Sequence, residues 1–256
     1  MKVIIKSAFF IVFILNLNLT FAQQIEISYE HKKLLQPKNL PVHDVHKLIN
    51  INNSYSVYSF AKKLRSNAHA MAITTDGSED LLAYKNFEKD SIITVYPIVT
   101  AYRYIAESIP RINWQLTEEY KEILGYNARK ATANYRGRDY VAFFTDKLPV
   151  SDGPWKFNGL PGLILEIYDS ENKVSYEAIS IKISEKANHK FDLNTKIEGK
   201  RLYTFDEYIR MVKKSQDRIK TAIRSALSNS SGAGVSEYTE AAKYHQEVEI
   251  VDFEKY

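Results

Sequence analysis

The chain has 256 residues, contains no cysteine and carries a formal net charge of +4. The lack of cysteine excludes disulfides, zinc-thiolate sites and a thiol nucleophile, so a packed core must stabilise the fold. The charge is small, and no block of Lys and Arg is interleaved with aromatic residues, which argues against nucleic-acid binding.

The first 22 residues have the order of a cleavable export signal. Lys2 and Lys6 precede a short apolar run over 8–15, and Ala22 follows as a small residue at the predicted cleavage point. The run is too short to cross a bilayer, which takes about 20 apolar residues. Cleavage removes two lysines and lowers the net charge from +4 to +2. The sequence therefore predicts an exported, soluble protein, periplasmic or secreted, with no membrane span and no lipid anchor after cleavage.

Period-two hydrophobicity dominates the mature chain and predicts strands. Residues 24–31 alternate apolar and polar side chains, and 48–60 form a further extended segment with a bend at Asn52 and Asn53. Residues 61–72 favour a short helix because they are rich in Ala, Lys and Leu. Further strands are predicted over 82–87, 92–99, 102–105, 112–116, 120–135, 139–145, 163–168 and 174–183. Such short connections imply an antiparallel meander, since parallel neighbours need long crossovers.

One long helix follows the strands. Thr204 and Glu207 form a capping box at its start. One face has apolar residues at helical spacing, namely Phe205, Tyr208, Ile209, Val212, Ile219, Ile223 and Leu227. The other face is basic (Lys213, Lys214, Arg218, Lys220 and Arg224), which is typical of a solvated face, with contact to anionic lipid headgroups as the alternative.

These elements predict a mainly β protein: a long antiparallel meander forming one curved, half-barrel-like sheet with a C-terminal amphipathic helix packed on it. The predicted division is a cleaved signal over 1–22, a single β-rich domain over 23–227, and a flexible linker with a strand-like tail over 228–256.

The segment from Pro149 to Gly162, called the signature loop below, concentrates three of the nine glycines and three of the seven prolines. It also carries Trp155, Phe157 and Leu160, apolar groups that need a surface to pack on. Flexible linkers lack such residues, so the loop is predicted to be rigid and to lie at one rim of the sheet.

The run Gly159-Leu160-Pro161-Gly162-Leu163-Ile164 resembles the signature of the GLPGLI family, secreted and largely uncharacterised proteins found mainly in Bacteroidetes. Further segments resemble family positions in the same order: Ile112-Asn113-Trp114, Gly125-Tyr126, Lys130-Ala131-Thr132, Tyr135-Arg136-Gly137-Arg138 and Gly153-Pro154-Trp155-Lys156-Phe157. The resemblance covers about 102–168 and implies no reaction. Ala128 stands where many relatives have Cys, so thiol chemistry there is absent. The meander with a helix is also similar, by fold analogy alone, to LolA-like periplasmic lipoprotein carriers.

The usual catalytic motifs are missing: there is no Gly-x-Ser-x-Gly elbow, no phosphate loop and no His-Glu-x-x-His. His43 and His46 would share one face of a helix, but no third ligand is evident, so the prediction is two surface histidines, no metal and no cofactor. Asp152, Glu166 and Asp169 could supply an acid and base. Turn roles for Asp152 and Asp169 are favoured, as is a salt bridge from Glu166 to Arg136 or Arg138.

Three functions remain open from the sequence. The favoured one is a non-enzymatic binding or carrier protein whose concave face holds an apolar or peptide-like ligand. The alternatives are a structural module that docks an envelope protein in an outer-membrane assembly, and an envelope hydrolase using Asp152 or Glu166. Trp114 is predicted to pack in the core, whereas Trp155 is an equal candidate for binding. The candidate binding residues are Asp152, Gly153, Pro154, Trp155, Lys156, Phe157, Gly159, Leu160, Pro161 and Gly162, with Arg136, Arg138 and Glu166 as a possible polar site.

Overall fold

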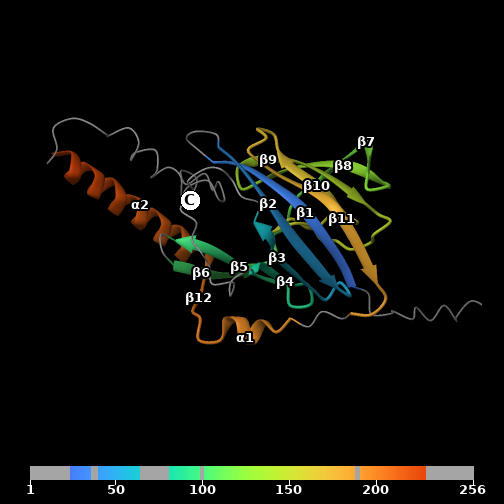
Figure 1. Cartoon of the computed structure of the whole chain (residues 1–256), viewed down its shortest axis with the longest axis horizontal. Helices are drawn as coiled ribbons and strands as arrows, with labels where there is room; N and C mark the ends of the chain where they lie inside the picture. The colour runs from blue at the N-terminus through green and yellow to red at the C-terminus, as the bar shows by residue number, and fades with distance from the viewer. Residues whose placement is uncertain (1–23, 36–39, 64–80, 99–100, 188–190, 229–256) are drawn as a thin grey trace, which may run out of the picture.

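The structure, a computed structural model, describes residues 24–35, 40–63, 81–98, 101–187 and 191–228 (Figure 1). The predicted signal segment, the predicted tail after 228 and most of the helix predicted over 61–72 lie outside these ranges. The start of that predicted helix is instead the end of a strand, which runs to Lys63.

The described chain is mainly β, as predicted. Its strands are β1 (Gln24–Leu35), β2 (Leu40–Ile51), β3 (Tyr55–Lys63), β4 (Leu81–Asn86), β5 (Ser91–Ile98), β6 (Ala101–Ser108), β7 (Gln115–Ile123), β8 (Tyr126–Tyr135), β9 (Arg138–Thr145), β10 (Leu163–Asp169), β11 (Val174–Ser184) and β12 (Leu202–Tyr203). Its helices are α1 (Leu193–Ile197) and α2 (Phe205–Ser228).

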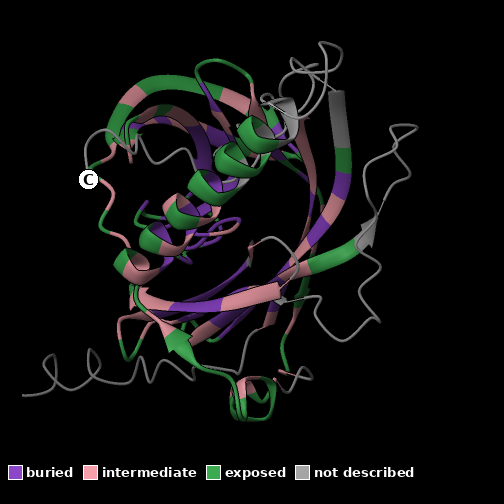
Figure 2. Ribbon diagram, turned by 90° about the vertical axis from the view of Figure 1, so that its left-hand side faces the viewer, coloured by how far each residue is buried: buried purple, intermediate pink, exposed green. Residues whose placement is uncertain are grey.

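All the strands belong to one 12-stranded sheet with the order β12-β6-β5-β4-β3-β2-β1-β11-β10-β9-β8-β7. Two meanders, β1 to β6 and β7 to β11, are joined where β1 pairs with β11. The pairs are antiparallel except for the short parallel pair of β12 with β6. The sheet curves strongly, and α2 crosses its open side (Figure 2). The predicted curved antiparallel meander with a C-terminal helix is therefore confirmed.

Two segments that the sequence predicts as continuous extended chain are each divided into two strands by a tight turn. Asn52 and Asn53, with φ of 51° and 56°, join β2 to β3. Leu124 and Gly125, with φ of 52° and 79°, join β7 to β8. Left-handed residues at two successive positions are typical of hairpin turns whose twist matches that of the strands; the β7–β8 turn consists of two such residues, and the β2–β3 turn also contains Ser54. The predicted single strand over 120–135 is therefore wrong, because the chain reverses at Gly125.

The capping box of α2 is confirmed. The backbone N–H of Thr204 donates to Glu207 Oε2 at 2.9 Å, and the N–H of Glu207 donates to Thr204 Oγ1 at 3.2 Å. The buried residues Tyr208, Ile209 and Val212 then pack on Tyr96 of β5 and Ile105 of β6. The first half of the predicted apolar face is thus in contact with the sheet, and the helix continues beyond it (Figure 1). Neither described helix is sufficiently long and apolar to traverse a bilayer.

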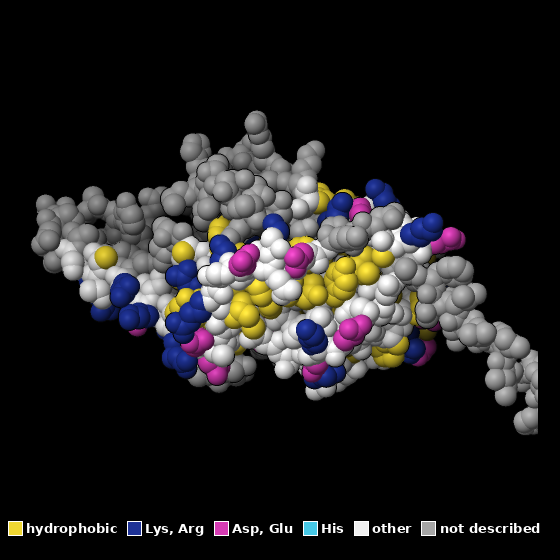
Figure 3. Space-filling view, turned by 90° about the horizontal axis from the view of Figure 1, so that it is seen from below, with side chains coloured by type: hydrophobic (Ala, Val, Ile, Leu, Met, Phe, Trp, Pro, Cys, Tyr) yellow, Lys and Arg dark blue, Asp and Glu magenta, His cyan; other side chains and the backbone are white. Residues whose placement is uncertain are grey.

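The outer side of β3 to β6 has its own apolar cluster, which includes Val57, Tyr84 and Tyr104. Leu193 and Ile197 of α1 pack against it. Seen from below, apolar side chains form a band across this face between charged groups (Figure 3).

The signature loop does not lie at the rim of the sheet. Leu148, Val150, Phe157 and Leu160 are buried in the main core with inward side chains of β1, β2 and β10. Position 162 requires glycine, because an added Cβ would come within 2.1 Å of the backbone oxygen of Thr145. The loop therefore occupies the concave side that the sequence assigns to a ligand.

Candidate metal centre

Three metal-ligating side chains meet on the concave face where β1 and β2 pair. His31 on β1 lies directly opposite Asp44 on β2, and Tyr29 lies opposite His46. Asp44 and His46 are two residues apart on one strand, so both point to the same side of the sheet as His31. The register therefore brings these three residues together, and we call them the histidine cluster.

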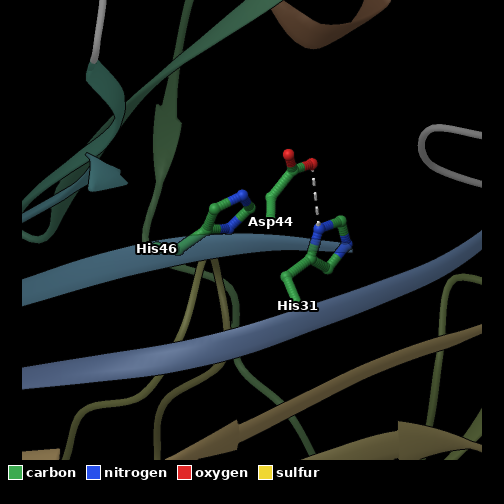
Figure 4. Close-up of side chains that lie close together, drawn as sticks. All are labelled: His31, Asp44 and His46. Atoms are coloured by element: carbon green, nitrogen blue, oxygen red, sulfur yellow. Dashed lines mark ion pairs between the residues drawn. The ribbon is translucent and has the colours of Figure 1, made fainter. Parts of the chain in front are cut away.

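The ligand atoms of the histidine cluster converge. One nitrogen from each histidine and one oxygen of Asp44 all lie within 4.8 Å of one another. His31 Nδ1 is 4.0 Å from Asp44 Oδ2, and the three side chains point toward a common space (Figure 4). Ligands about 2.0 to 2.2 Å from a tetrahedral zinc are roughly 3.3 Å apart. The ligand atoms of the cluster are thus up to about 1.5 Å farther apart than those around a bound zinc, and the side chains would have to close on an ion.

Aromatic rings hold the two imidazoles. His31 is stacked on Tyr176, its neighbour across the β1–β11 pair, with ring centroids 4.7 Å apart. The two histidine rings are stacked at 4.6 Å, and Phe60 meets His46 edge-on at 4.8 Å. Because these rings restrict rotation of the imidazoles, the site is largely preorganised.

Tyr58 orients His46 through a hydrogen bond of 2.6 Å between its Oη and His46 Nδ1. In the tautomer with the proton on Nδ1, the imidazole donates to Tyr58 and Nε2 presents a lone pair. Burial raises the pKa of Tyr58 well above its usual value, so the phenol stays neutral and can accept this bond. A second hydrogen bond of this kind is how proteins commonly fix a metal-binding histidine.

Both histidines are neutral at physiological pH. Burial lowers the pKa of His46 to about 3. Burial, followed by repulsion from His46, also lowers the pKa of His31 well below its usual value. Neutral imidazole is the form that binds metals. Among the described residues, His46 Nε2 and His31 Nδ1 are buried without a hydrogen-bond partner, an arrangement that folded proteins seldom leave unfilled.

The structure corrects the secondary structure predicted around His43 and His46. His43 and His46 are not three apart on a helix, because this stretch is strand β2. They lie on opposite faces, with His43 exposed and His46 buried, so the prediction of two surface histidines is wrong for His46. The alternation of side chains along a strand could have revealed the cluster. His31 continues the inward-facing series Ile25, Ile27 and Tyr29. Asp44 and His46 are two residues apart, a spacing that places both on one side of a strand.

A second polar cluster, made of Asn50, Lys85 and Asp152 and called the anchor cluster, fixes the signature loop to strands β2 and β4. Asp152 of the loop accepts hydrogen bonds from Lys85 Nζ at 2.7 Å and from Asn50 Nδ2 at 2.9 Å. Lys85 Nζ also donates to the backbone oxygens of Gly153 at 2.8 Å and Phe157 at 3.0 Å. All three side chains are buried. Asp152 is thus committed to fixing the loop.

The other end of the loop is tied toward α2. Lys156 is buried, pairs with Glu107 of β6 and lies 5.1 Å from the ring centroid of Phe205. Arg136 donates to the same Glu107 at 2.7 Å. Trp155 is half-buried against Tyr96, so it is less open than the exposed docking anchor that the interaction-module alternative predicts.

The remaining predicted site residues also have structural partners. Trp114 is half-buried on the main core, and its Nε1 donates to the backbone oxygen of Asn158 at 2.8 Å. Arg138 binds the buried Asp169 at 2.8 Å, and Asp169 also accepts the backbone N–H groups of Lys173 and Val174.

Glu166 pairs with Lys121 and not with Arg136 or Arg138. Ile167, its neighbour in β10, lies opposite the inward residue Tyr176, so Glu166 is on the outer face whereas Asp152 is inside. The two candidate carboxylates of the hydrolase alternative therefore do not share a cleft.

Comparison with known proteins concerns the family and the fold. Residues 135–166 match the model of a family described as a protein of unknown function, Porph_ging. The resemblance to an uncharacterised, Bacteroidetes-associated family is thereby confirmed over the signature loop and its flanking strands. No curated protein matches the chain.

The chain matches two solved structures of PNGF-II. One matches with a TM-score of 0.52 and 18% sequence identity, over 76% of this chain and 34% of PNGF-II. The other matches with a TM-score of 0.46 and 16% identity over the same shares. This chain thus spans about a third of PNGF-II, and at 18% identity the first match shows a likeness of fold alone.

Proposed function

We propose that this protein binds a divalent transition metal ion, with zinc the best-suited ion, through His31, Asp44 and His46. The observation that carries the proposal is the convergence of two neutral imidazoles and a carboxylate within 4.8 Å on a preorganised inner face. Two nitrogens and one oxygen suit zinc and its transition-metal neighbours, whereas calcium and magnesium favour all-oxygen sites. Three protein ligands leave a fourth position for water or a small ligand.

The carrier alternative has less support from the concave face. Side chains of the signature loop fill the main core there, where an apolar ligand would have to lie. The histidine cluster lies beside this core, against Tyr176, and its side chains keep exposures of 12% for His31 and 10% for Asp44. Combined with the predicted export signal, the function we favour is metal binding in the cell envelope or outside the cell.

The test is calorimetric titration of zinc into untagged protein that has been stripped with a chelator, because a polyhistidine tag would itself bind zinc. We expect one zinc ion per chain, and no binding after His46→Ala or His31→Ala. His43→Ala is the matched control, because His43 is exposed and on the opposite side of the same strand. Absence of binding by the unchanged protein, or equal binding by His46→Ala and His43→Ala, would refute the proposal.

A further inference from the structure

The anchor cluster combines the three groups that an internal amide cross-link requires: an amine, a side-chain amide and a carboxylate. Lys85, Asn50 and Asp152 are buried to 1%, 1% and 0% exposure. The two oxygens of Asp152 accept hydrogen bonds from different residues: Oδ1 accepts from Lys85 Nζ, and Oδ2 accepts from Asn50 Nδ2. One carboxylate therefore contacts both the nucleophile and the leaving group of such a reaction.

Strand register lines up the two residues that would be joined. Asn50 of β2 lies opposite Ser56 of β3, and Ser56 lies opposite Lys85 of β4. The three residues form one row on one face, and the outer two are two strand spacings apart, roughly 10 Å. An extended lysine side chain and an asparagine side chain together bridge that distance. Ser56, small and buried between them, leaves room for the lysine to pass.

The surroundings favour the reacting forms of these groups. Burial lowers the pKa of Lys85, opposed by the neighbouring Asp152, so the neutral amine is easier to reach than in water. The backbone N–H of Asn53 donates to Asn50 Oδ1 at 3.1 Å. This donor polarises the side-chain carbonyl and would stabilise negative charge that develops on its oxygen.

We propose that Lys85 and Asn50 form an isopeptide bond, with Asp152 as the acid and base. Asp152 takes one proton from the Lys85 ammonium, and the amine Nζ attacks Asn50 Cγ to give a tetrahedral intermediate. Asp152 then returns that proton to Nδ2 as the Cγ–Nδ2 bond breaks. Nζ loses a further proton to the leaving nitrogen, so that ammonium departs and a neutral amide remains. No oxidant or other reactant is consumed.

The product would tie β2 to β4 across β3, directly below the signature loop. The chain contains no cysteine, so it has no disulfide to serve this purpose. A covalent bond in the sheet would resist unfolding in any redox environment, which is valuable to a protein that functions outside the cytoplasm. The proposal is independent of metal binding, because the histidine cluster shares none of these residues.

The test is mass spectrometry of the full-length purified chain under denaturing conditions, followed by proteolytic mapping. We expect the chain to be lighter by one ammonia, with a branched peptide that joins the segments around Asn50 and Lys85. After the predicted signal cleavage the chain begins with Gln23, and an N-terminal glutamine can cyclise with the same loss of mass. The branched peptide, and not the mass alone, is therefore the evidence for the cross-link. Lys156 is the internal control: it is also buried beside a carboxylate, but its partner Glu107 is no amide, and cleavage after Lys156 should be normal.

Lys85→Arg and Asp152→Ala should both restore the missing ammonia. If these variants fail to fold, peptide mapping of the unchanged protein still shows whether the cross-link is present. Two separate linear peptides containing Asn50 and Lys85 would overturn the proposal. A mass lower by one water, with Lys85 joined to Asp152, would also overturn the proposal, because Asp152 and not Asn50 would then have been attacked.

Discussion

Two polar clusters lie on the concave face of the same sheet and differ in how their hydrogen bonds are filled. In the anchor cluster, Lys85 Nζ has three acceptors, and both polar atoms of the Asn50 side chain have partners. In the histidine cluster, two imidazole nitrogens are buried without a hydrogen-bond partner among the described residues. Saturated polar groups hold a structure together, whereas open ones are free for a ligand. The first cluster therefore anchors the signature loop and the second is the candidate metal site.

The largest effect is expected where the saturated cluster is broken. Lys85→Met removes the nitrogen that binds Asp152, whether as a free ammonium or as the proposed amide, and leaves the buried carboxylate without this partner, so the free energy of unfolding should fall by about 3 to 5 kcal/mol. Urea denaturation measures this loss. Lys121→Met is the control, since its pair with Glu166 is partly exposed and should be worth about 1 kcal/mol or less. Equal losses in the two variants would mean that the anchor cluster has no special role.

Substitution of the last glycine of the signature loop tests the same side of the comparison. Gly162→Ala places a Cβ against the backbone of Thr145, which cannot move aside without disturbing β9, and should cost about 3 kcal/mol. Gly199→Ala serves as the control: its φ of 67° is unfavourable for alanine, but no atom lies within 4 Å of an added Cβ. Its cost should be about 1 kcal/mol. Thermal unfolding of the two variants should therefore differ, and similar melting temperatures would contradict the tight seat of the loop.

Acid should destabilise the metal-free protein through the open cluster. Both histidines have a lower pKa when folded than the value of about 6.5 expected when unfolded, so the unfolded chain binds more protons below that pH. The free energy of unfolding should thus fall as pH falls, by about 2 kcal/mol between pH 6.5 and 5.5 for the two residues, and continue to fall toward pH 3. His46→Phe should lose about half of this dependence. An unchanged slope would show that His46 is not buried as a neutral base.

The smallest effect concerns the residue that orients the site. Tyr58→Phe removes the hydrogen bond to His46 Nδ1 and should weaken zinc binding about 10-fold, or about 1.4 kcal/mol. Tyr55→Phe is the control, because Tyr55 is stacked on Tyr84 in the outer cluster. Titration calorimetry compares the two dissociation constants. If both variants bind zinc like the unchanged protein, Tyr58 does not position the ligand.

Much of the fold follows from local patterns, but the site does not. Alternation predicts the strands and the capping box predicts the start of α2, since both depend on residues close in sequence. The sequence predicts the signature loop at the rim of the sheet because its prolines and glycines resemble those of a surface turn. Its burial depends on Lys85 and Asn50, which are distant in sequence and reach Asp152 only in the folded sheet. Likewise, His31 and Asp44 become a pair only through the β1–β2 register, which no local pattern reveals.

The most direct test of the central claim is anomalous diffraction at the zinc absorption edge from crystals of the zinc-loaded protein. We predict one strong peak between β1 and β2, about 2.0 to 2.2 Å from a nitrogen of His31, a nitrogen of His46 and an oxygen of Asp44. A peak elsewhere on the molecule, or none at the histidine cluster at saturating zinc, would contradict the claim.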